Sequence, residues 1–294
     1  MTTYGCILCV GILAVFALYT LRLRKYQHPL SEGIISLVFC TVCGAIFSKL
    51  GYCLLLADTE LFGYGIDSLF SFYPYEFSVF CGGIGVLCGI VLASRICKQA
   101  SVSSLDLFAP CGALLLFVIR IGESQLGSIG AGPLLNGESW LTRIGFAFVN
   151  NYGEWHFSVY LLEAILALFC SIYFFFRSFK EKGQTFQWTL FMLALPQVFC
   201  ESLRARCMKW GFVRIEQLLC GLLLLFLIWL GCKKNSSGAG KQKYLPLIIS
   251  IFCVILIVFV EFALDKLPIS TLMCYVLMIL ALVIMAVMKK KTEL

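Results

Sequence analysis

Charged side chains, histidine and proline are all scarce in this sequence. Only 13% of the 294 residues are Asp, Glu, Lys or Arg, and the chain has two histidines and seven prolines. With so little histidine we expect neither a metalloenzyme nor a metal site, and scarce proline argues against long ordered loops. A soluble domain of this length cannot bury a chain that is 61% hydrophobic, so lipid must be its solvent.

Cysteine, in contrast, is abundant, with sixteen copies. Most of them lie inside apolar runs, where cysteine behaves as a small hydrophobic residue. Cys6-x-x-Cys9 and Cys40-x-x-Cys43 have the spacing of a metal or redox motif, but neither has histidine or further cysteine ligands beside it. We therefore predict helix-packing residues and no cofactor. The net charge of +7 has to be interpreted through membrane topology, and we expect no nucleic-acid partner.

Nine apolar runs are long enough, at about 17–25 residues, to cross a bilayer as helices. The first has no Lys or Arg before it and is expected to be a retained helix rather than a signal peptide. The sixth is interrupted by Pro196 and ends in charged residues. We predict an all-α polytopic membrane protein, with a core of seven helices and two further C-terminal helices. The runs are Tyr4–Leu21, Ile34–Leu56, Phe77–Ser94, Leu105–Ile121, Ser158–Phe176, Phe186–Leu203, Ile215–Gly231, Leu245–Phe262 and Ile269–Met288.

The distribution of basic residues predicts the orientation. With the N-terminus outside, inner loops and ends hold 15 Lys and Arg residues and outer loops hold six. This asymmetry favours an N-out, C-in topology. The expected divisions are a membrane domain over 1–232, containing an extracytoplasmic loop or head at 122–157, then a cytoplasmic linker at 233–243 and a C-terminal transmembrane hairpin at 244–294.

Ionisable and polar groups within the predicted helices gather in their outer halves under this topology. Because an ionised group in hydrocarbon costs at least about 2.5–3.5 kcal/mol, each is a candidate functional residue. We expect one polar cavity at the level of the outer headgroups, with cations for a phosphate and carboxylates to pair them or accept a proton. Its candidate residues are Tyr4, Lys49, Tyr52, Arg120, Glu163, Glu201, Arg204, Glu216 and Gln217.

Several of these residues, and some charged residues near them, also have a structural interpretation. Lys49 can extend to the interface, and Tyr4 and Tyr52 can anchor helices there. Arg120 and Glu123 can form a structural pair, and Glu163 can hold the fold by pairing with Arg120 or Lys49. A basic cluster in an outer loop is either a solvated surface or a site for anionic lipid headgroups; it contains Arg204, Arg206, Lys209 and Arg214. His156 is a surface residue or a proton acceptor.

Ile119-Arg120-Ile121-Gly122-Glu123 belongs to a set of short motifs that occur in order over residues 4–231. This segment is similar to the G-R-I-G-N signature around the essential arginine of the prolipoprotein diacylglyceryl transferase family, and the ordered set resembles that family. The other matching segments, in chain order, are Tyr4-Gly5, Ser48-Lys49-Leu50-Gly51-Tyr52, Ser78-Val79-Phe80-Cys81-Gly82-Gly83, Leu105-Asp106-Leu107-Phe108-Ala109-Pro110, Leu161-Leu162-Glu163-Ala164 and Val198-Phe199-Cys200-Glu201-Ser202-Leu203-Arg204.

The resemblance implies transfer of diacylglyceryl from phosphatidylglycerol, or another anionic phospholipid, to the lipobox cysteine of a lipoprotein precursor's signal peptide. It also implies a multi-pass protein of the bacterial cytoplasmic membrane. Catalytic roles would fall on Arg120, Glu123, Glu163 and Arg204, with Glu123 or His156 as base. Substrate binding would involve Tyr4, Lys49, Tyr52, Cys81, Gly82, Gly83, Glu201 and Arg206.

Two departures affect the chemistry that the resemblance implies. The family's functional histidine falls on Cys81, and the asparagine of its R-I-G-N signature falls on Glu123. Lipid binding therefore carries over more directly than catalysis. The alternatives are a non-catalytic lipid-binding relative or membrane-complex subunit with the same fold, and a small-molecule transporter, which explains the intramembrane charges but not the ordered motifs.

Overall fold

The computed structural model describes residues 2–57, 60–73, 76–127, 130–137, 140–150, 152–177, 179, 181–234 and 243–293. Each predicted apolar run forms a long helix, so the all-α polytopic class is confirmed. The predicted linker lies mostly outside the described residues. The long helices are α1 (Thr2–Lys25), α2 (Leu30–Leu55), α3 (Val79–Ile96), α4 (Ser101–Glu123), α6 (Val159–Phe176), α7 (Gln184–Leu203), α8 (Ile215–Lys234), α9 (Leu245–Lys266) and α10 (Thr271–Lys291).

Eight helices in the described part of the chain are long and apolar enough to cross a membrane. The exception among the long helices is α7, the run interrupted by Pro196. It has 20 residues, which gives it sufficient length at about 1.5 Å per residue, but Gln184, Gln187, Gln197 and Glu201 make it more polar than the others. The length of α7 is therefore sufficient to cross a membrane, but its composition alone does not predict that it does.

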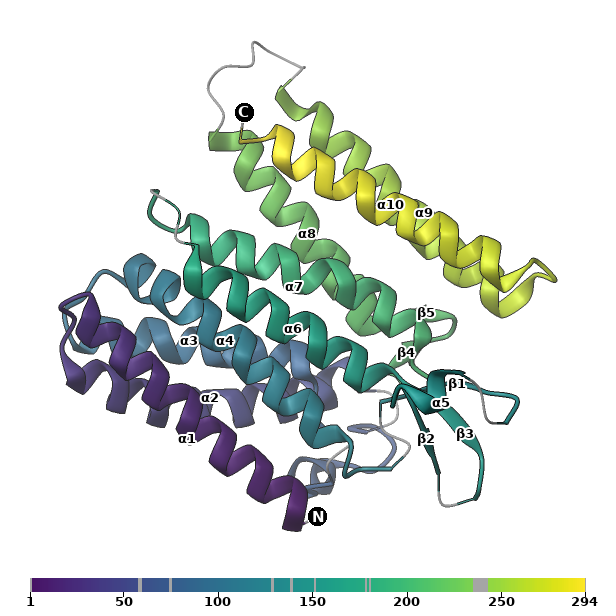
Figure 1. Ribbon diagram of the computed structural model, residues 1–294, viewed down its shortest axis with the longest axis horizontal. Coiled ribbons are helices and arrows are strands. Elements are labelled where there is room, and N and C mark those ends of the chain that lie inside the picture. The colour runs from purple at the N-terminus through teal and green to yellow at the C-terminus, as the bar shows by residue number, and fades with distance from the viewer. Residues whose placement is uncertain are drawn as a thin grey trace. The chain divides into compact units, whose positions relative to one another are not determined.

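The chain divides into two compact units, Met1–Leu190 and Phe191–Leu294. In the first unit, helices α1 to α4 surround an apolar core, and α6 packs along α4 (Figure 1). The rings of Tyr19 and Phe108 meet edge to face at 5.2 Å between centroids in this core. Cys40 and Cys111 are buried in the same cluster, as expected for cysteines that pack helices.

Small residues let α2 and α3 approach closely. A Cβ at Gly89 would lie 2.7 Å from the Cα and N atoms of Cys40, so any side chain there would collide with the α2 backbone. Ser78 starts α3 by accepting a hydrogen bond from the Cys81 N–H at 3.2 Å. Ser48 on α2 donates its hydroxyl to the Ser78 carbonyl at 2.6 Å. The start of α3 is therefore fixed against α2.

The chain forms a small antiparallel sheet after α4 and before α6, within the segment predicted as a loop at 122–157. Its strands are β1 (Ala131–Leu134), β2 (Ala147–Val149) and β3 (Trp155–Ser158), in the order β1-β3-β2, with the short helix α5 (Trp140–Arg143) before β2. Strand β3 leads directly into α6 (Figure 1). The sequence predicted an extracytoplasmic loop or head here and no strands. The chain between α2 and α3 also contains a 3-10 helix, η1 (Ile66–Phe70).

In the second unit, α9 and α10 pack against each other and both contact α8. Lys289 near the end of α10 donates to the Leu227 carbonyl of α8 at 3.4 Å. A two-stranded hairpin of β4 (Lys209–Trp210) and β5 (Val213–Arg214) connects the end of α7 to the start of α8. The predicted C-terminal helical pair thus belongs to the same compact unit as α8.

Candidate functional site

A buried cluster of opposite charges forms where α4 ends beside α6. The Arg120 side chain is 2% exposed, and its Nε lies 2.6 Å from Glu163 Oε2. Its Nη1 also pairs with Glu123 Oε1, three residues further along α4. Glu123 and Glu163 are themselves buried. Because isolated charges are costly in an apolar interior, these three side chains have to be held together as a unit.

Two glycines allow other parts of the first unit to close around this cluster. A Cβ at Gly122 would lie 2.9 Å from Cε2 of Tyr4, so the Tyr4 ring packs directly against the glycine between Arg120 and Glu123. A Cβ at Gly130, where φ is +79°, would lie 2.9 Å from Glu123 Oε2. Gly130 therefore lies against the Glu123 carboxylate, and the Tyr4 ring lies beside Gly122.

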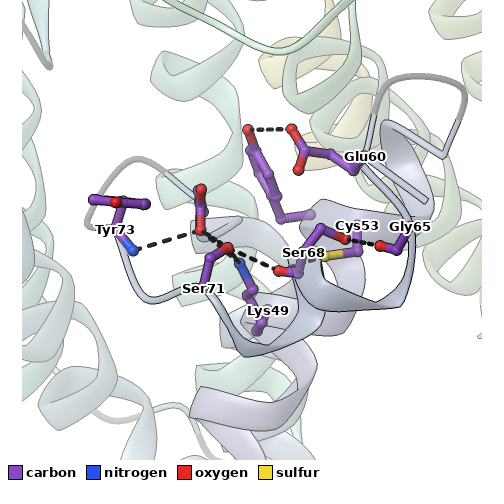
Figure 2. Close-up of polar contacts among 9 residues, drawn as sticks. Lys49, Cys53, Glu60, Gly65, Ser68, Ser71 and Tyr73 are labelled. Carbon is purple, nitrogen blue, oxygen red and sulfur yellow. Dashed lines mark hydrogen bonds and ion pairs between the residues drawn. The ribbon is translucent and has the colours of Figure 1, made fainter. Parts of the chain in front are cut away.

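Lys49 is a second buried cation, and its partner is a carboxylate from the loop that precedes α3. Lys49 Nζ lies 2.7 Å from Glu76 Oε2 and 3.3 Å from Ser71 Oγ, and Ser71 donates to the same carboxylate at 2.6 Å. Burial raises the pKa of Glu76, but the hydrogen bonds from Lys49 and Ser71 outweigh it and hold that pKa below its usual value. Figure 2 shows Ser71 of this loop beside Lys49 of α2.

The pairing of Lys49 changes what this lysine offers to a ligand. Its charge is compensated by Glu76, so an incoming phosphate would have to compete with a carboxylate already in place. Tyr52, one turn further along α2, donates to Glu60 Oε1 at 3.3 Å in the same loop. Lys49 and Tyr52 therefore organise the loop, in addition to any contact with substrate.

The predicted positions at the start of α3 lie against the α2 motif. The Cys81 side chain fills the space that a Cβ at Gly51 would occupy, and a Cβ at Gly82 would lie 3.2 Å from Ser48 Cβ. Gly83 is exposed and has nothing near its missing Cβ. The Cys81 side chain thus packs between α2 and α3.

The second unit carries its own pair of predicted site residues at the end of α7. Arg204 Nε lies 3.4 Å from Glu201 Oε1, and Gln197 donates to the same oxygen at 3.0 Å. Glu201 and Arg204 are buried, whereas Arg206 is exposed. The structure places Arg120 with Glu163 in one unit and Arg204 with Glu201 in the other. That all four line one cavity stays a prediction.

Arg214, predicted to belong to a basic cluster in an outer loop, makes contacts that the sequence did not predict. Arg214 lies in β5 and pairs through Nε with Glu261 Oε2 on α9 at 3.0 Å. Its Nη1 lies 3.1 Å from the Cys207 sulfur. Burial raises the pKa of the Cys207 thiol, although Arg214 opposes this effect. Glu261 sits inside an apolar run, so the cost of a charge in hydrocarbon was a signal that could have identified it.

His156, the alternative proton acceptor, is built into the small sheet. Its Nδ1 lies 3.2 Å from the Gly132 carbonyl oxygen, and its Nε2 lies 3.1 Å from Asn150 Nδ2. Gly132 lies in β1 and Asn150 directly follows β2, so both ring nitrogens have neighbours in or next to the sheet, which favours a structural role. No group of three or more His, Cys, Asp or Glu side chains in the described ranges is placed to hold a metal ion.

Comparison with known proteins gives two matches. Residues 1–233 match the family described as prolipoprotein diacylglyceryl transferase. The chain is also 20% identical, over 257 residues, to the phosphatidylglycerol–prolipoprotein diacylglyceryl transferase of Clostridium novyi (strain NT); the match covers 82% of this chain and 94% of that protein. The family match spans the segments in which the ordered motifs occur. The chain therefore belongs to the prolipoprotein diacylglyceryl transferase family, as those motifs predicted.

Proposed function

We propose that this protein transfers the diacylglyceryl group of phosphatidylglycerol to the lipobox cysteine of a lipoprotein precursor. The cysteine sulfur forms a thioether bond to the glycerol carbon that bears the phosphate. The carbon–oxygen bond to that phosphate breaks, and glycerol phosphate leaves with the electron pair while a base takes the thiol proton. The family match over residues 1–233 is the observation that carries this proposal.

The cluster around Arg120 suits the charge changes of this reaction. One guanidinium stands between two carboxylates, so the group has an excess of negative charge when both are ionised. A phosphate that binds Arg120 would displace one of them or require its protonation. We assign Arg120 to the leaving phosphate, Glu163 to its orientation, and Glu123 to the thiol proton, because the displaced carboxylate becomes a proton acceptor.

The remaining predicted residues are assigned to substrate binding. Arg204 supplies a second cation for the phosphate, oriented by Glu201. Lys49 acts together with its loop, since Glu76 compensates its charge. The other proposed binding residues are Tyr4, Tyr52, Cys81, Gly82, Gly83 and Arg206.

We further propose that the protein lies in the bacterial cytoplasmic membrane with its N-terminus outside and its C-terminus inside. The eight apolar helices indicate a multi-pass protein, and the distribution of Lys and Arg supports the orientation. Its partners are then phosphatidylglycerol of the outer leaflet and the signal peptide of the precursor. The proposed divisions are a membrane domain at 1–232 with its head at 122–157, a linker at 233–243 and a hairpin at 244–294.

Lipidation of a reporter lipobox peptide by the purified protein in phosphatidylglycerol micelles tests the proposal. We expect the parent to release glycerol phosphate, and Arg120→Ala to reduce turnover about 100-fold or more, as for the loss of one preorganised donor to a developing anion. Arg143→Ala in α5, an exposed arginine outside the cluster, is the matched control. A parent that retains phosphatidylglycerol without turnover would instead support the non-catalytic lipid-binding relative.

A further inference from the structure

Glu261 is a carboxylate on an apolar helix that lies beyond the region matched by the family. It belongs to α9, whereas the family match ends at residue 233. Its side chain is buried, and both of its oxygens are engaged. Oε2 pairs with Arg214 Nε at 3.0 Å, and Oε1 accepts from Gln217 Nε2 at 2.9 Å. An unpaired carboxylate there would be costly, so these two contacts hold α9 to the start of α8.

Arg214 extends this connection to the end of α7. Its Nη1 donates to the carbonyl oxygens of Glu201 at 2.6 Å and of Arg204 at 2.7 Å. The last carbonyls of a helix have no partner within the helix and need a donor from elsewhere. Arg214 supplies that donor at the turn from which the side chains of Glu201 and Arg204 project.

Gln217 makes a second connection between Glu261 and α7. Its Nε2 donates both to Glu261 Oε1 and to the Val198 carbonyl oxygen, the latter at 3.0 Å. Val198 lies less than one turn before Glu201 on the same helix. Glu261 therefore reaches α7 through two different donors, one on each of its oxygens. Loss of its charge would release both at once.

We propose that Glu261, supplied by the appended C-terminal hairpin, is a positioning residue that sets the orientation of Arg204 and Glu201 through Arg214 and Gln217. This inference rests on the proposed function, because it assigns Arg204 to the phosphate. It gives the hairpin a role in the reaction that a passive membrane anchor would not have. Removing Glu261 would also leave the partly buried Arg214 without its carboxylate, so the Arg214 guanidinium would turn toward other acceptors.

The first test is turnover of phosphatidylglycerol and a lipobox peptide by the full chain. We expect Glu261→Ala to lower kcat by about tenfold or more, since small misplacements of positioning groups are costly. Asp265→Asn on the same helix is the control, because Asp265 is exposed and pairs with Lys266. In the Arg204→Ala background, Glu261→Ala should cause no further fall in kcat. A double variant whose fall in kcat equals the product of the two single falls would overturn the inference.

A second test does not depend on turnover. Cys207 touches Arg214 Nη1 at 3.1 Å, so release of Arg214 should expose the thiol to iodoacetamide. Release of Arg214 also removes a charge that lowers the pKa of this thiol, so rates are compared on the high-pH plateau, where the thiol is ionised in every variant. There we expect faster alkylation of Cys207 in Glu261→Ala than in the parent or Asp265→Asn, quantified peptide by peptide in a mass spectrometer. If the alanine variant does not fold, Glu261→Gln replaces it in both tests, because glutamine keeps the size and one acceptor oxygen. We then expect smaller effects in the same direction.

The two proposals fail in different ways. A parent without transfer activity contradicts the proposed function, and the alkylation of Cys207 together with retention of phosphatidylglycerol in native mass spectrometry still tests the role of Glu261. A parent and a Glu261→Ala variant with equal turnover, lipid retention and Cys207 reactivity would contradict the positioning role while leaving the transferase function intact.

Discussion

Several buried charges in this protein have partners of opposite charge, some close in sequence and some distant, and the partners decide what each charge can do. Arg120 is paired with a carboxylate three residues away and with Glu163 on another helix. Lys49 is paired with Glu76 across 27 positions of the chain. The same guanidinium or ammonium group would attract a phosphate strongly if it were alone, but here a ligand must compete with an existing carboxylate.

The Lys49–Glu76 pair gives a prediction at the scale of one residue. Glu76→Gln leaves the buried Lys49 without its carboxylate, so we expect the free energy of unfolding to fall by about 3 kcal/mol at pH 7. Because folding lowers the pKa of Glu76, its contribution is present above the unfolded-state value of about 4.3 and is lost as the pH falls through the lower folded-state value. Thermal unfolding in detergent should therefore separate parent and variant at pH 7 and bring them together in acid.

The control for this pair is Asp67→Asn, an exposed carboxylate in the first turn of η1 in the same loop. It should leave the unfolding temperature unchanged at both pH values. An equal gap between parent and Glu76→Gln at neutral and acidic pH would show that the ionised carboxylate is not what stabilises the loop.

Sequence alone identified the charged side chains but only some of their partners. Arg120, Glu123 and Glu163 stood out because charges are rare in apolar runs, and the three meet in one cluster. Glu76 did not stand out, because a carboxylate in a polar loop carries no such signal. Glu261 carried the signal and was overlooked. Pairing across tens of residues depends on tertiary packing, which the spacing of residues does not encode.

At the scale of whole elements, hydropathy predicted the helices well and the strands not at all. A run of about 20 apolar residues is easy to recognise in a sequence, and as a helix it has the length needed to span a bilayer. The strands β1, β2 and β3 have only three or four residues each, too few to show an alternating pattern. The head was therefore predicted as a loop of unspecified form.

The contact between α2 and α3 gives a prediction at this scale. A Cβ at Gly89 would lie 2.7 Å from the Cys40 backbone, so Gly89→Ala must push the two helices apart. We expect a cost of about 1–3 kcal/mol, measured as a lower unfolding temperature in detergent. Gly5→Ala on α1 is the matched control, because no atom lies within 4 Å of the added Cβ. Equal stability of the two variants would contradict close packing at Gly89.

At the scale of the whole molecule, α7 decides the orientation of everything after it. If α7 crosses the membrane with the eight more apolar helices, the two ends of the chain lie on opposite sides; if it does not, they lie on the same side. The polar composition of α7 is compatible with either topology, but the distribution of basic residues favours one of them. Lys233, Lys234 and Lys289–Lys291 would all move outside if α7 failed to cross, against the positive-inside bias.

We therefore expect α7 to cross, because its 20 residues span about 30 Å and its polar side chains find partners within the protein. Green fluorescent protein fused to the C-terminus should fluoresce, and alkaline phosphatase inserted after Gly137 in the head should be active. Fusions at Lys98, between α3 and α4, report a loop predicted inside and serve as the internal standard. An active phosphatase at the C-terminus together with an inactive one at Lys98 would mean that α7 does not cross. The hairpin of α9 and α10 would then enter from the opposite side.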